Sequence, residues 1–209
     1  GGNVPDLLKV AADLQSFGAQ GITIHPRPDQ RHIRYDDALA LPAVVTTEFN
    51  IEGNPIPKFI DLVLQIQPDQ VTLVPDAEDA ITSNAGWDTI KHKDFLVEVI
   101  SEFKSNGIRT SIFVDPIEKM VEGAKNTGTD RIELYTEAYA QNFKKNPEIA
   151  IAPYKQATLL ANDLDIGINA GHDLNLENTA FFVQNIPMPP VYMQSAVWLR
   201  RKEAEEILK

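Results

Sequence analysis

Residues 18–34 read GAQGITIHPRPDQRHIR, in which a short β-rich run is followed at once by a loop crowded with basic side chains. The run GITIH at residues 21–25 predicts a strand, because it is apolar and rich in β-branched residues. Ahead of it, apolar residues recur from Leu7 to Phe17 at the spacing of one helix face, and Gly18 provides a stop signal. A helix, a strand and a polar loop in this order are a first indication of an α/β protein.

The same alternation continues along the chain. Further strands are predicted at residues 44–49, 70–74, 109–115, 131–136, 166–169 and 191–198, and helical patterns fall at residues 57–67, 92–103, 117–126, 148–164 and 176–185. Strands that are nearly continuously apolar and alternate with helices indicate a parallel sheet buried on both faces.

Seven strands with a helix as the first element predict an α/β fold of the TIM-type (β/α)8 barrel class that lacks its first strand. An open doubly wound sheet is the alternative. We favour the barrel because polar residues follow many different strands, whereas an open sheet concentrates its site at one switch point. No Gly-rich dinucleotide fingerprint follows any strand. Without a linker or a low-complexity tract, residues 1–209 are expected to form a single domain.

The composition narrows the classes of function. A net charge of −11 argues against a nucleic-acid partner, which needs clustered basic residues. No apolar run approaches the roughly 20 residues that cross a bilayer, so we expect no membrane association and a cytoplasmic protein. The sequence contains no cysteine, which excludes disulfides and thiolate chemistry. Acid–base work therefore falls to histidines and carboxylates.

The loop HPRPDQRHIR at residues 25–34 carries two histidines and three arginines directly after a predicted strand. The loop brings three basic residues close together in sequence: Arg27, Arg31 and His32. They could bind a phosphorylated small molecule, because such binding depends on the local electrostatic potential and not on the net charge of the protein. A solvated surface loop of no particular function is the alternative. The position after a strand favours the functional interpretation.

Glu48 lies in an otherwise uncharged run at residues 44–49. A carboxylate in a buried strand is costly unless it is paired or protonated, and burial raises a carboxyl pKa towards the working pH, so Glu48 is a candidate general base. A structural pairing with a backbone amide or an arginine is the alternative. Glu133 in the predicted strand RIELYT invites the same two interpretations.

His172 follows the predicted strand IGIN, where Gly171 permits a sharp turn. A lone histidine is more often a satisfied polar group than a catalyst. Two histidines and a buried glutamate at the ends of separate strands are more informative, because such ends meet at one face of a parallel sheet. We therefore predict that His25, Glu48 and His172 converge on one cavity at the carboxyl face.

Two other kinds of chemistry were weighed. A Schiff-base aldolase needs a lysine on a strand, and no predicted strand contains one. A metal hydrolase could use His25, His172, Asp76 and Asp115, but no HxH or HExxH spacing occurs, and we expect no metal. The long polar loop at residues 74–88, which contains Thr82, has the length of a ligand clamp.

Three segments resemble the pyridoxine 5'-phosphate synthase family: GITIHPRPDQRHIRYDD at residues 21–37, LVPDAEDAITSNAGWD at 73–88 and INAGHDL at 168–174. The segments TTEFNIEG and RIELYTEAYA resemble it as well, so that the similarity extends to about Pro187. The resemblance implies condensation of 3-amino-2-oxopropyl phosphate with 1-deoxy-D-xylulose 5-phosphate, which closes the pyridine ring of vitamin B6 without a metal or redox cofactor.

The resemblance also implies roles for single residues. His25, Glu48 and His172 would be the acid–base residues. The residues implied in substrate binding are Arg27, His32 and Thr82, which would hold the deoxyxylulose phosphate, together with Glu133 and Asp173. Asp173 stands where many family members carry glycine, and a carboxylate there would repel phosphate in a tight site.

The end of the chain departs from the family pattern. The family closes with a Gly-His strand that binds phosphate, whereas residues 191–198 read VYMQSAVW, and the charged helical pattern from Leu199 is also unlike the family. The last βα unit is therefore expected to be altered. A noncatalytic barrel that serves as a scaffold or binding module is the alternative function. A sheet that lacks its first strand has an unpaired edge, which favours association with another chain. The resemblance also implies a homo-oligomer, because members of the family form homo-oligomers.

Overall fold

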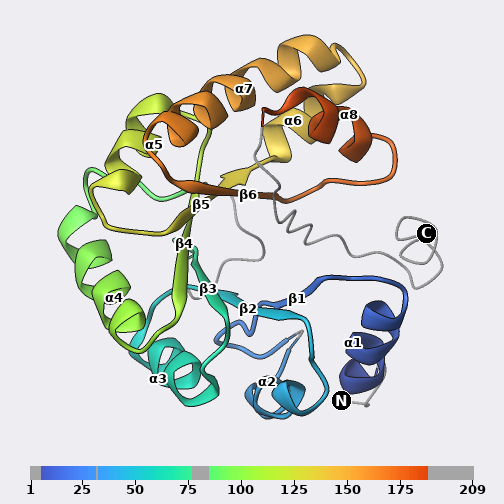
Figure 1. The fold of residues 1–209 in the computed structure, drawn as a ribbon, viewed down its shortest axis with the longest axis vertical. Coiled ribbons are helices and arrows are strands. Elements are labelled where there is room, and N and C mark those ends of the chain that lie inside the picture. The colour runs from blue at the N-terminus through green and yellow to red at the C-terminus, as the bar shows by residue number, and fades with distance from the viewer. Residues whose placement is uncertain (1–5, 32, 77–84, 188–209) are drawn as a thin grey trace.

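The computed structural model describes residues 6–31, 33–76 and 85–187. Its strands are β1 (Gly21–Ile24), β2 (Glu48–Gly53), β3 (Gln70–Leu73), β4 (Arg109–Val114), β5 (Arg131–Tyr135) and β6 (Gly167–Gly171). They form one parallel sheet in which neighbours in sequence are neighbours in space. The sheet curls into a half-barrel with helices along its convex side (Figure 1). The chain therefore has an α/β fold of the TIM-like kind.

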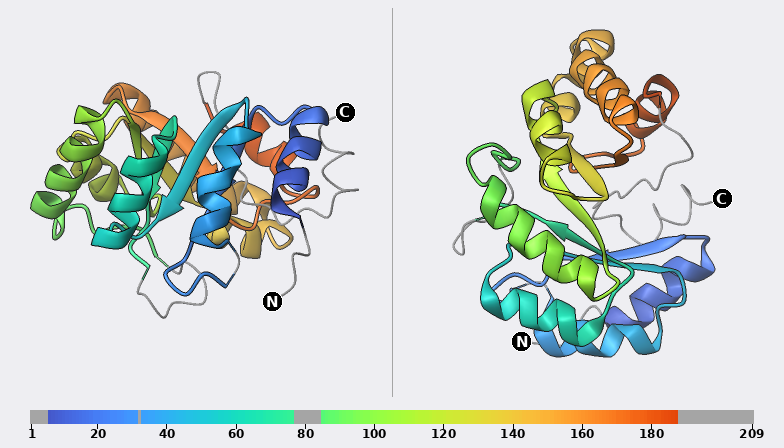
Figure 2. Two further views of the ribbon diagram at one scale, coloured as in Figure 1. Left: turned by 90° about the horizontal axis from the view of Figure 1, so that it is seen from below. Right: turned by 60° about the vertical axis from the view of Figure 1, so that its left-hand side comes forward.

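The helices follow the order expected for a chain that alternates between sheet and surface. They are α1 (Leu7–Ser16), α2 (Tyr35–Ala40), the 3-10 helix η1 (Leu41–Ala43), α3 (Pro57–Ile66), α4 (Lys93–Ser105), α5 (Glu118–Lys125), α6 (Glu137–Phe143), α7 (Pro147–Asp163) and α8 (Thr179–Asn185). Figure 2 shows this helical layer from two further directions. The side chain of Asp6 accepts a hydrogen bond from the Lys9 amide and caps the start of α1. None of the helices within the described residues is long and apolar enough to cross a membrane.

The two faces of the sheet differ in chemistry. Side chains alternate between the faces of a strand, and the register keeps each face in line across all six strands. The face beneath the helices is apolar, with Ile51, Val71, Ile112, Ile132 and Ile168 buried in the core. The concave face carries buried polar residues, among them Asn50, Thr72, Ser111, Glu133 and Asn169. The predicted parallel sheet buried on both faces is confirmed, but only its outer face is apolar.

The strand predicted at residues 44–49 is wrong in its bounds, since β2 runs from Glu48 to Gly53. Residues 44–47, which precede β2, are hydrogen-bonded to α1 and not to a neighbouring strand. The side-chain oxygen of Gln15 accepts hydrogen bonds from the amides of Thr46 and Thr47 at 2.7 and 3.1 Å, and its amide nitrogen donates to the carbonyl of Val44 at 3.0 Å. The β-branched residues of this segment therefore precede the strand.

The other strands predicted before residue 188 lie within a few residues of their observed positions. The predicted strand at residues 191–198 and the altered helix from Leu199 lie outside the described residues. The predicted helix at residues 148–164 corresponds to α7, which begins at Pro147 with Asn146 as its cap. Its aromatic residue Tyr154 packs with Tyr139 of α6 and Phe182 of α8, which ties three helices together beside β5 and β6.

Candidate active site

The carboxyl ends of the six strands carry a set of ionisable side chains. They are His25 after β1, Glu52 in β2, Asp76 after β3, Asp115 after β4, Glu133 in β5 and His172 after β6. All six strands are parallel, so these residues come to the same end of the half-barrel. The carboxyl face is where TIM-type folds place their chemistry.

His25 and Glu52 form a close pair at this face. The Nδ1 atom of His25 lies 3.2 Å from an Oε1 of Glu52. Glu52 is 8% exposed, and its side chain points to the concave side of the sheet together with Asn50. A carboxylate at Nδ1 fixes the orientation of the imidazole and directs proton exchange to Nε2. The pair therefore has the arrangement of an oriented acid–base histidine.

Glu133 is buried on the same concave face, with only 2% of its surface exposed. Burial raises its pKa well above the ordinary range, and the charge of nearby Glu52 raises it further. Its Oε2 atom has no hydrogen-bond partner among the described residues. Both effects favour the protonated form of Glu133, which can donate a hydrogen bond beside Glu52.

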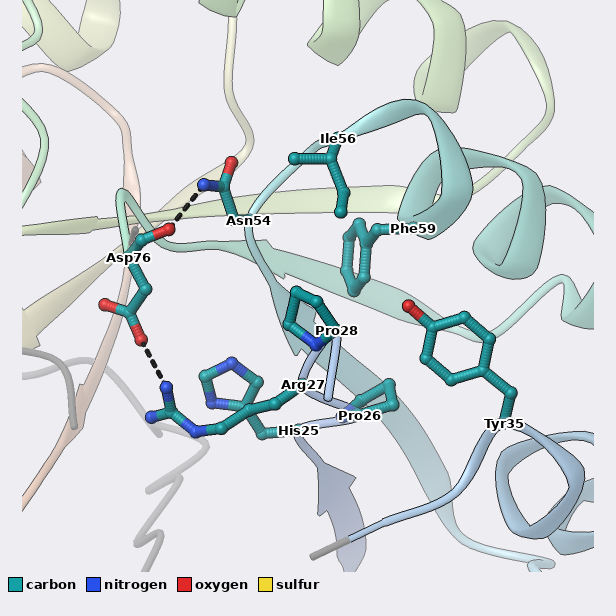
Figure 3. A pocket seen from close by; sticks show the side chains of 9 residues that line it. All are labelled: His25, Pro26, Arg27, Pro28, Tyr35, Asn54, Ile56, Phe59 and Asp76. Carbon is teal, nitrogen blue, oxygen red and sulfur yellow. Dashed lines mark hydrogen bonds and ion pairs between the residues drawn. The ribbon is translucent and has the colours of Figure 1, made fainter. Parts of the chain in front are cut away.

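Arg27 and His25 line the same pocket (Figure 3). The guanidinium of Arg27 is 3.3 Å from the Asp76 carboxylate, and both residues are buried. The side chain of Asn54 donates to the carbonyl of Asp76 and holds the end of β3 in place. Two prolines, Pro26 and Pro28, line the pocket around the base of Arg27. A buried cation at the carboxyl face suits the binding of an anionic substrate group.

His172 lies at the other outer strand, after β6. Its ring contacts Tyr135 edge to face, with the ring centroids 4.9 Å apart and an interplanar angle of 87°. The Tyr135 hydroxyl donates to Glu137, and burial raises the tyrosine pKa, followed by the effect of that carboxylate. Tyr135 is therefore a neutral phenol at physiological pH, and its ring gives His172 a fixed support.

Glu48 is at the opposite end of the sheet, so the prediction that it converges with His25 and His172 is wrong. It is the first residue of β2 and pairs in register with Gly21 at the start of β1. Its carboxylate forms an ion pair with Arg109, the first residue of β4. The structural alternative weighed for Glu48, a pairing with an arginine, describes this contact.

Glu52 is the residue that the sequence interpretation missed. The run EFNIEG places Glu48, Asn50 and Glu52 at every second position, and therefore on one face of a strand. Four residues of strand separate the two glutamates by about 13 Å. Starting the strand at residue 48 would have brought Glu52, and not Glu48, to the carboxyl face.

Apart from Glu48, the predicted site residues divide into three groups. His25, Arg27, Glu133 and His172 all lie at or below the carboxyl face. Asp173 lies beside His172, with an Oδ2 3.0 Å from Nδ1 of that histidine. His32 and Thr82 fall outside the described residues. Within the described residues, no three His, Asp or Glu side chains gather closely enough to hold a metal ion.

Histidines and carboxylates at the carboxyl ends of parallel strands define an α/β enzyme of TIM-like architecture. The solved structure of phosphoribosylanthranilate isomerase from Thermotoga maritima is similar in fold, with a TM-score of 0.61 and 18% identity over 95% of this chain and 90% of that one. The corresponding isomerase from Thermus thermophilus has a TM-score of 0.63 and 12% identity over 96% of this chain and 92% of that one. At such identities the likeness concerns the fold alone.

Sequence comparison is more specific. A protein named pyridoxine 5'-phosphate synthase from Flavobacterium johnsoniae is 70% identical over 187 residues, which are 90% of this chain and 79% of that protein. Proteins of the same name from Cytophaga hutchinsonii and Christiangramia forsetii are 65% and 63% identical over the same shares. The family model described as pyridoxal phosphate biosynthesis protein PdxJ matches residues 1–190, and the chain belongs to this family.

Proposed function

We propose that the chain is a pyridoxine 5'-phosphate synthase, which condenses 3-amino-2-oxopropyl phosphate with 1-deoxy-D-xylulose 5-phosphate by acid–base catalysis. The observation that carries this proposal is the pairing of His25 with Glu52 on the face that also carries buried Glu133, in a chain 70% identical to a protein of that name. The reaction joins an amine to a ketone, eliminates phosphate and water and closes a ring. These steps are redox-neutral, so the proposal includes no redox cofactor, and it includes no metal.

The first role falls to the pair of His25 and Glu52. The carboxylate of Glu52 accepts a hydrogen bond from the Nδ1–H of His25, so the Nε2 atom exchanges protons with the substrates. Imine formation, phosphate elimination and ring closure each move at least one proton. A single oriented imidazole is suited to take up and return protons at successive steps.

The second role falls to Glu133, which the resemblance implies in substrate binding. Burial, and then the charge of Glu52, raise the pKa of its carboxyl group, which favours the form that keeps its proton. A neutral carboxylic acid can donate a hydrogen bond to a substrate carbonyl or hydroxyl oxygen, and this bond strengthens as charge develops on that oxygen. Glu133 thus polarises the substrate from within the half-barrel.

His172 and Arg27 serve the opposite sides of the same face. His172, after β6, donates a proton to a leaving hydroxyl. Arg27, in its pocket, holds the phosphate of the deoxyxylulose substrate. His32 and Thr82 are proposed to share this phosphate, as the resemblance implies. Glu48 has no part in the proposed chemistry.

We also propose that the half-barrel belongs to a TIM-type (β/α)8 barrel that assembles as a homo-oligomer. The strand order, the curvature and the helical layer support the barrel. Light scattering at micromolar concentration tests the assembly, and a stable monomer would contradict it. A cytoplasmic location stays a prediction.

Two glutamates on the same face of β2 test the function. The purified chain is incubated with both substrates, and pyridoxine 5'-phosphate is quantified. Glu52→Gln removes the carboxylate at His25 and is expected to lower kcat by about two to four orders of magnitude, the range for positioned acid–base groups. Glu48→Gln is the matched control and is expected to keep kcat within a few-fold, because Glu48 lies at the other end of the strand.

The outcomes separate the competing interpretations. Circular dichroism of both variants verifies that the fold is retained. No product from the unaltered chain at high protein concentration would favour the noncatalytic scaffold. A large loss in Glu48→Gln together with an active Glu52→Gln would reverse the assignment of the two glutamates.

A further inference from the structure

We propose that Asp173 is a positioning residue for His172: its carboxylate accepts a hydrogen bond from the Nδ1–H of the imidazole and directs proton exchange with the substrate to Nε2. The Nδ1 atom of His172 and an Oδ2 of Asp173 are 3.0 Å apart. The catalytic meaning of this contact rests on the proposed function. The contact itself can be tested without any substrate.

The contact depends on an unusual backbone. His172 has φ of 95° and Asp173 has φ of 59°, so two consecutive residues other than glycine adopt left-handed conformations. Such conformations are uncommon outside glycine, and aspartate tolerates them better than most residues. The sharp reversal lets the carboxylate of Asp173 fold back onto the ring of the residue that precedes it.

Neighbouring side chains hold this turn from both sides. The hydroxyl oxygen of Thr136, which is fully buried, lies within hydrogen-bond distance of the carbonyl oxygens of both Gly171 and His172, which share its one proton. The side chain of Asn178 donates to the carbonyl of Asp173 at 3.2 Å. These bonds hold the backbone of both residues in the conformation that brings the Asp173 carboxylate to the imidazole.

The charges around His172 determine which nitrogen carries the proton. Asp173 faces Nδ1, and the neutral ring of Tyr135 lies against the imidazole from β5. Glu137 pairs with the hydroxyl of Tyr135, and Asp115 acts on the same phenol from the end of β4. An ionised carboxylate can only accept a hydrogen bond, so the contact with Asp173 requires a proton on Nδ1. Exchange with a substrate is thereby assigned to Nε2.

The same arrangement occurs at the other outer strand. At β1 the Nδ1 of His25 faces Glu52 at 3.2 Å, and after β6 the Nδ1 of His172 faces Asp173 at 3.0 Å. Each candidate acid–base histidine therefore has one carboxylate at the same ring atom. The two pairs differ in setting, since Glu52 is buried and Asp173 is half exposed.

A different role for Asp173 leads to the opposite results. If its carboxylate faced the substrate phosphates, its removal would relieve repulsion and lower KM. If it only shaped the turn, glycine would serve as well or better, because glycine adopts positive φ without a steric cost. Neither role predicts a change in the protonation site of His172.

The experiment measures the tautomer of His172 by ¹H–¹⁵N correlation NMR on ¹⁵N-histidine-labelled protein, with the signal assigned through His172→Gln. In the unaltered chain the neutral ring is expected to carry its proton on Nδ1. Asp173→Gly removes the acceptor and is expected to shift the ring towards the Nε2–H form, while Asp173→Asn retains a weaker acceptor and falls between. Asp165→Gly is the matched control, since Asp165 also has positive φ, of 53°, but precedes β6 at the other end of the strand.

Turnover gives a second measurement. Asp173→Gly is expected to lower kcat about 10-fold with KM within about twofold, as is usual when a residue that orients a functional histidine is lost. Asp165→Gly is expected to leave the tautomer and kcat unchanged. An unchanged His172 tautomer in Asp173→Gly, or a lower KM with unaltered kcat, would overturn the proposal. If the unaltered chain makes no product, the proposed function fails while the NMR measurement still decides whether Asp173 positions His172.

Discussion

Replacing Glu133 by glutamine is expected to make the protein progressively more stable than the unaltered chain as the pH rises. Glu133 is buried on the concave face of the sheet with 2% of its surface exposed. Its pKa is raised well above 4.5, first by burial and then by the charge of Glu52. Glutamine has nearly the same shape and cannot ionise, so the substitution removes this titration and little else.

The sign follows from proton linkage. Above the ordinary carboxyl pKa of 4.5, the unfolded chain has released the Glu133 proton, while the folded protein retains it up to its own raised pKa. The stability that this group contributes is therefore complete below about pH 4.5 and is lost as the pH rises towards the folded pKa. Over the pH range in which the unfolded chain has released this proton and the folded protein retains it, the loss is about 1.4 kcal/mol per pH unit.

Urea unfolding at half-unit intervals from pH 5 to 8 measures this difference. The free energy of unfolding of Glu133→Gln, minus that of the unaltered chain, is expected to rise with the stated slope. Glu98→Gln, at an exposed position of α4, is the matched control and should give a difference that does not change with pH. A Glu133→Gln difference that is equally flat across this range would show that Glu133 ionises normally and would refute the reasoning.

Three further substitutions test how the fold holds the site. Gln15→Ala removes the acceptor of two backbone amides before β2 and is expected to lower the free energy of unfolding by about 1–3 kcal/mol in urea titrations. Gly123→Ala places a methyl group 2.1 Å from Oγ1 of Thr89 and is expected to cost about 1–3 kcal/mol by the same assay. Tyr154→Phe removes the hydroxyl that donates to the carbonyl of Tyr135 at 2.8 Å, and should cost about 0.5–1.5 kcal/mol. A change below about 0.3 kcal/mol in any of them would contradict the contact on which it rests.

The strand GITIH and the loop after it show what local sequence can predict. Their apolar and β-branched residues indicated a strand, and the structure has β1 at Gly21–Ile24 with His25 directly after it. His172 was placed after its strand for the same reason, and β6 ends at Gly171. β1 ends one residue before its predicted end and β6 two residues after, so neighbouring residues were sufficient to place both histidines at strand ends.

Glu48 shows where such reasoning fails. The run VVTTEF has the β-branched composition of a strand, yet its first residues are bound by the side chain of Gln15, which is 31 residues distant from Thr46 in the sequence. Because side chains alternate along a strand, Glu48 and Glu52 share a face, and only the start of β2 decides which of them reaches the carboxyl end. The alternation of residue types along the sequence does not show at which residue β2 begins.

The sequence by itself determined the alternation of strands and helices, the polar chemistry of the strand ends and the family. These depend on residue type and spacing within short segments, which the chain carries whether or not it is folded. Only the tertiary structure decided that Glu52 faces His25, that burial raises the pKa of Glu133 and that Asp173 folds back onto His172. Each of these depends on contacts, burial or backbone conformation that exist only when distant segments pack together. The reason is that the neighbours of a side chain in space determine its solvent exposure and the electrostatic potential around it.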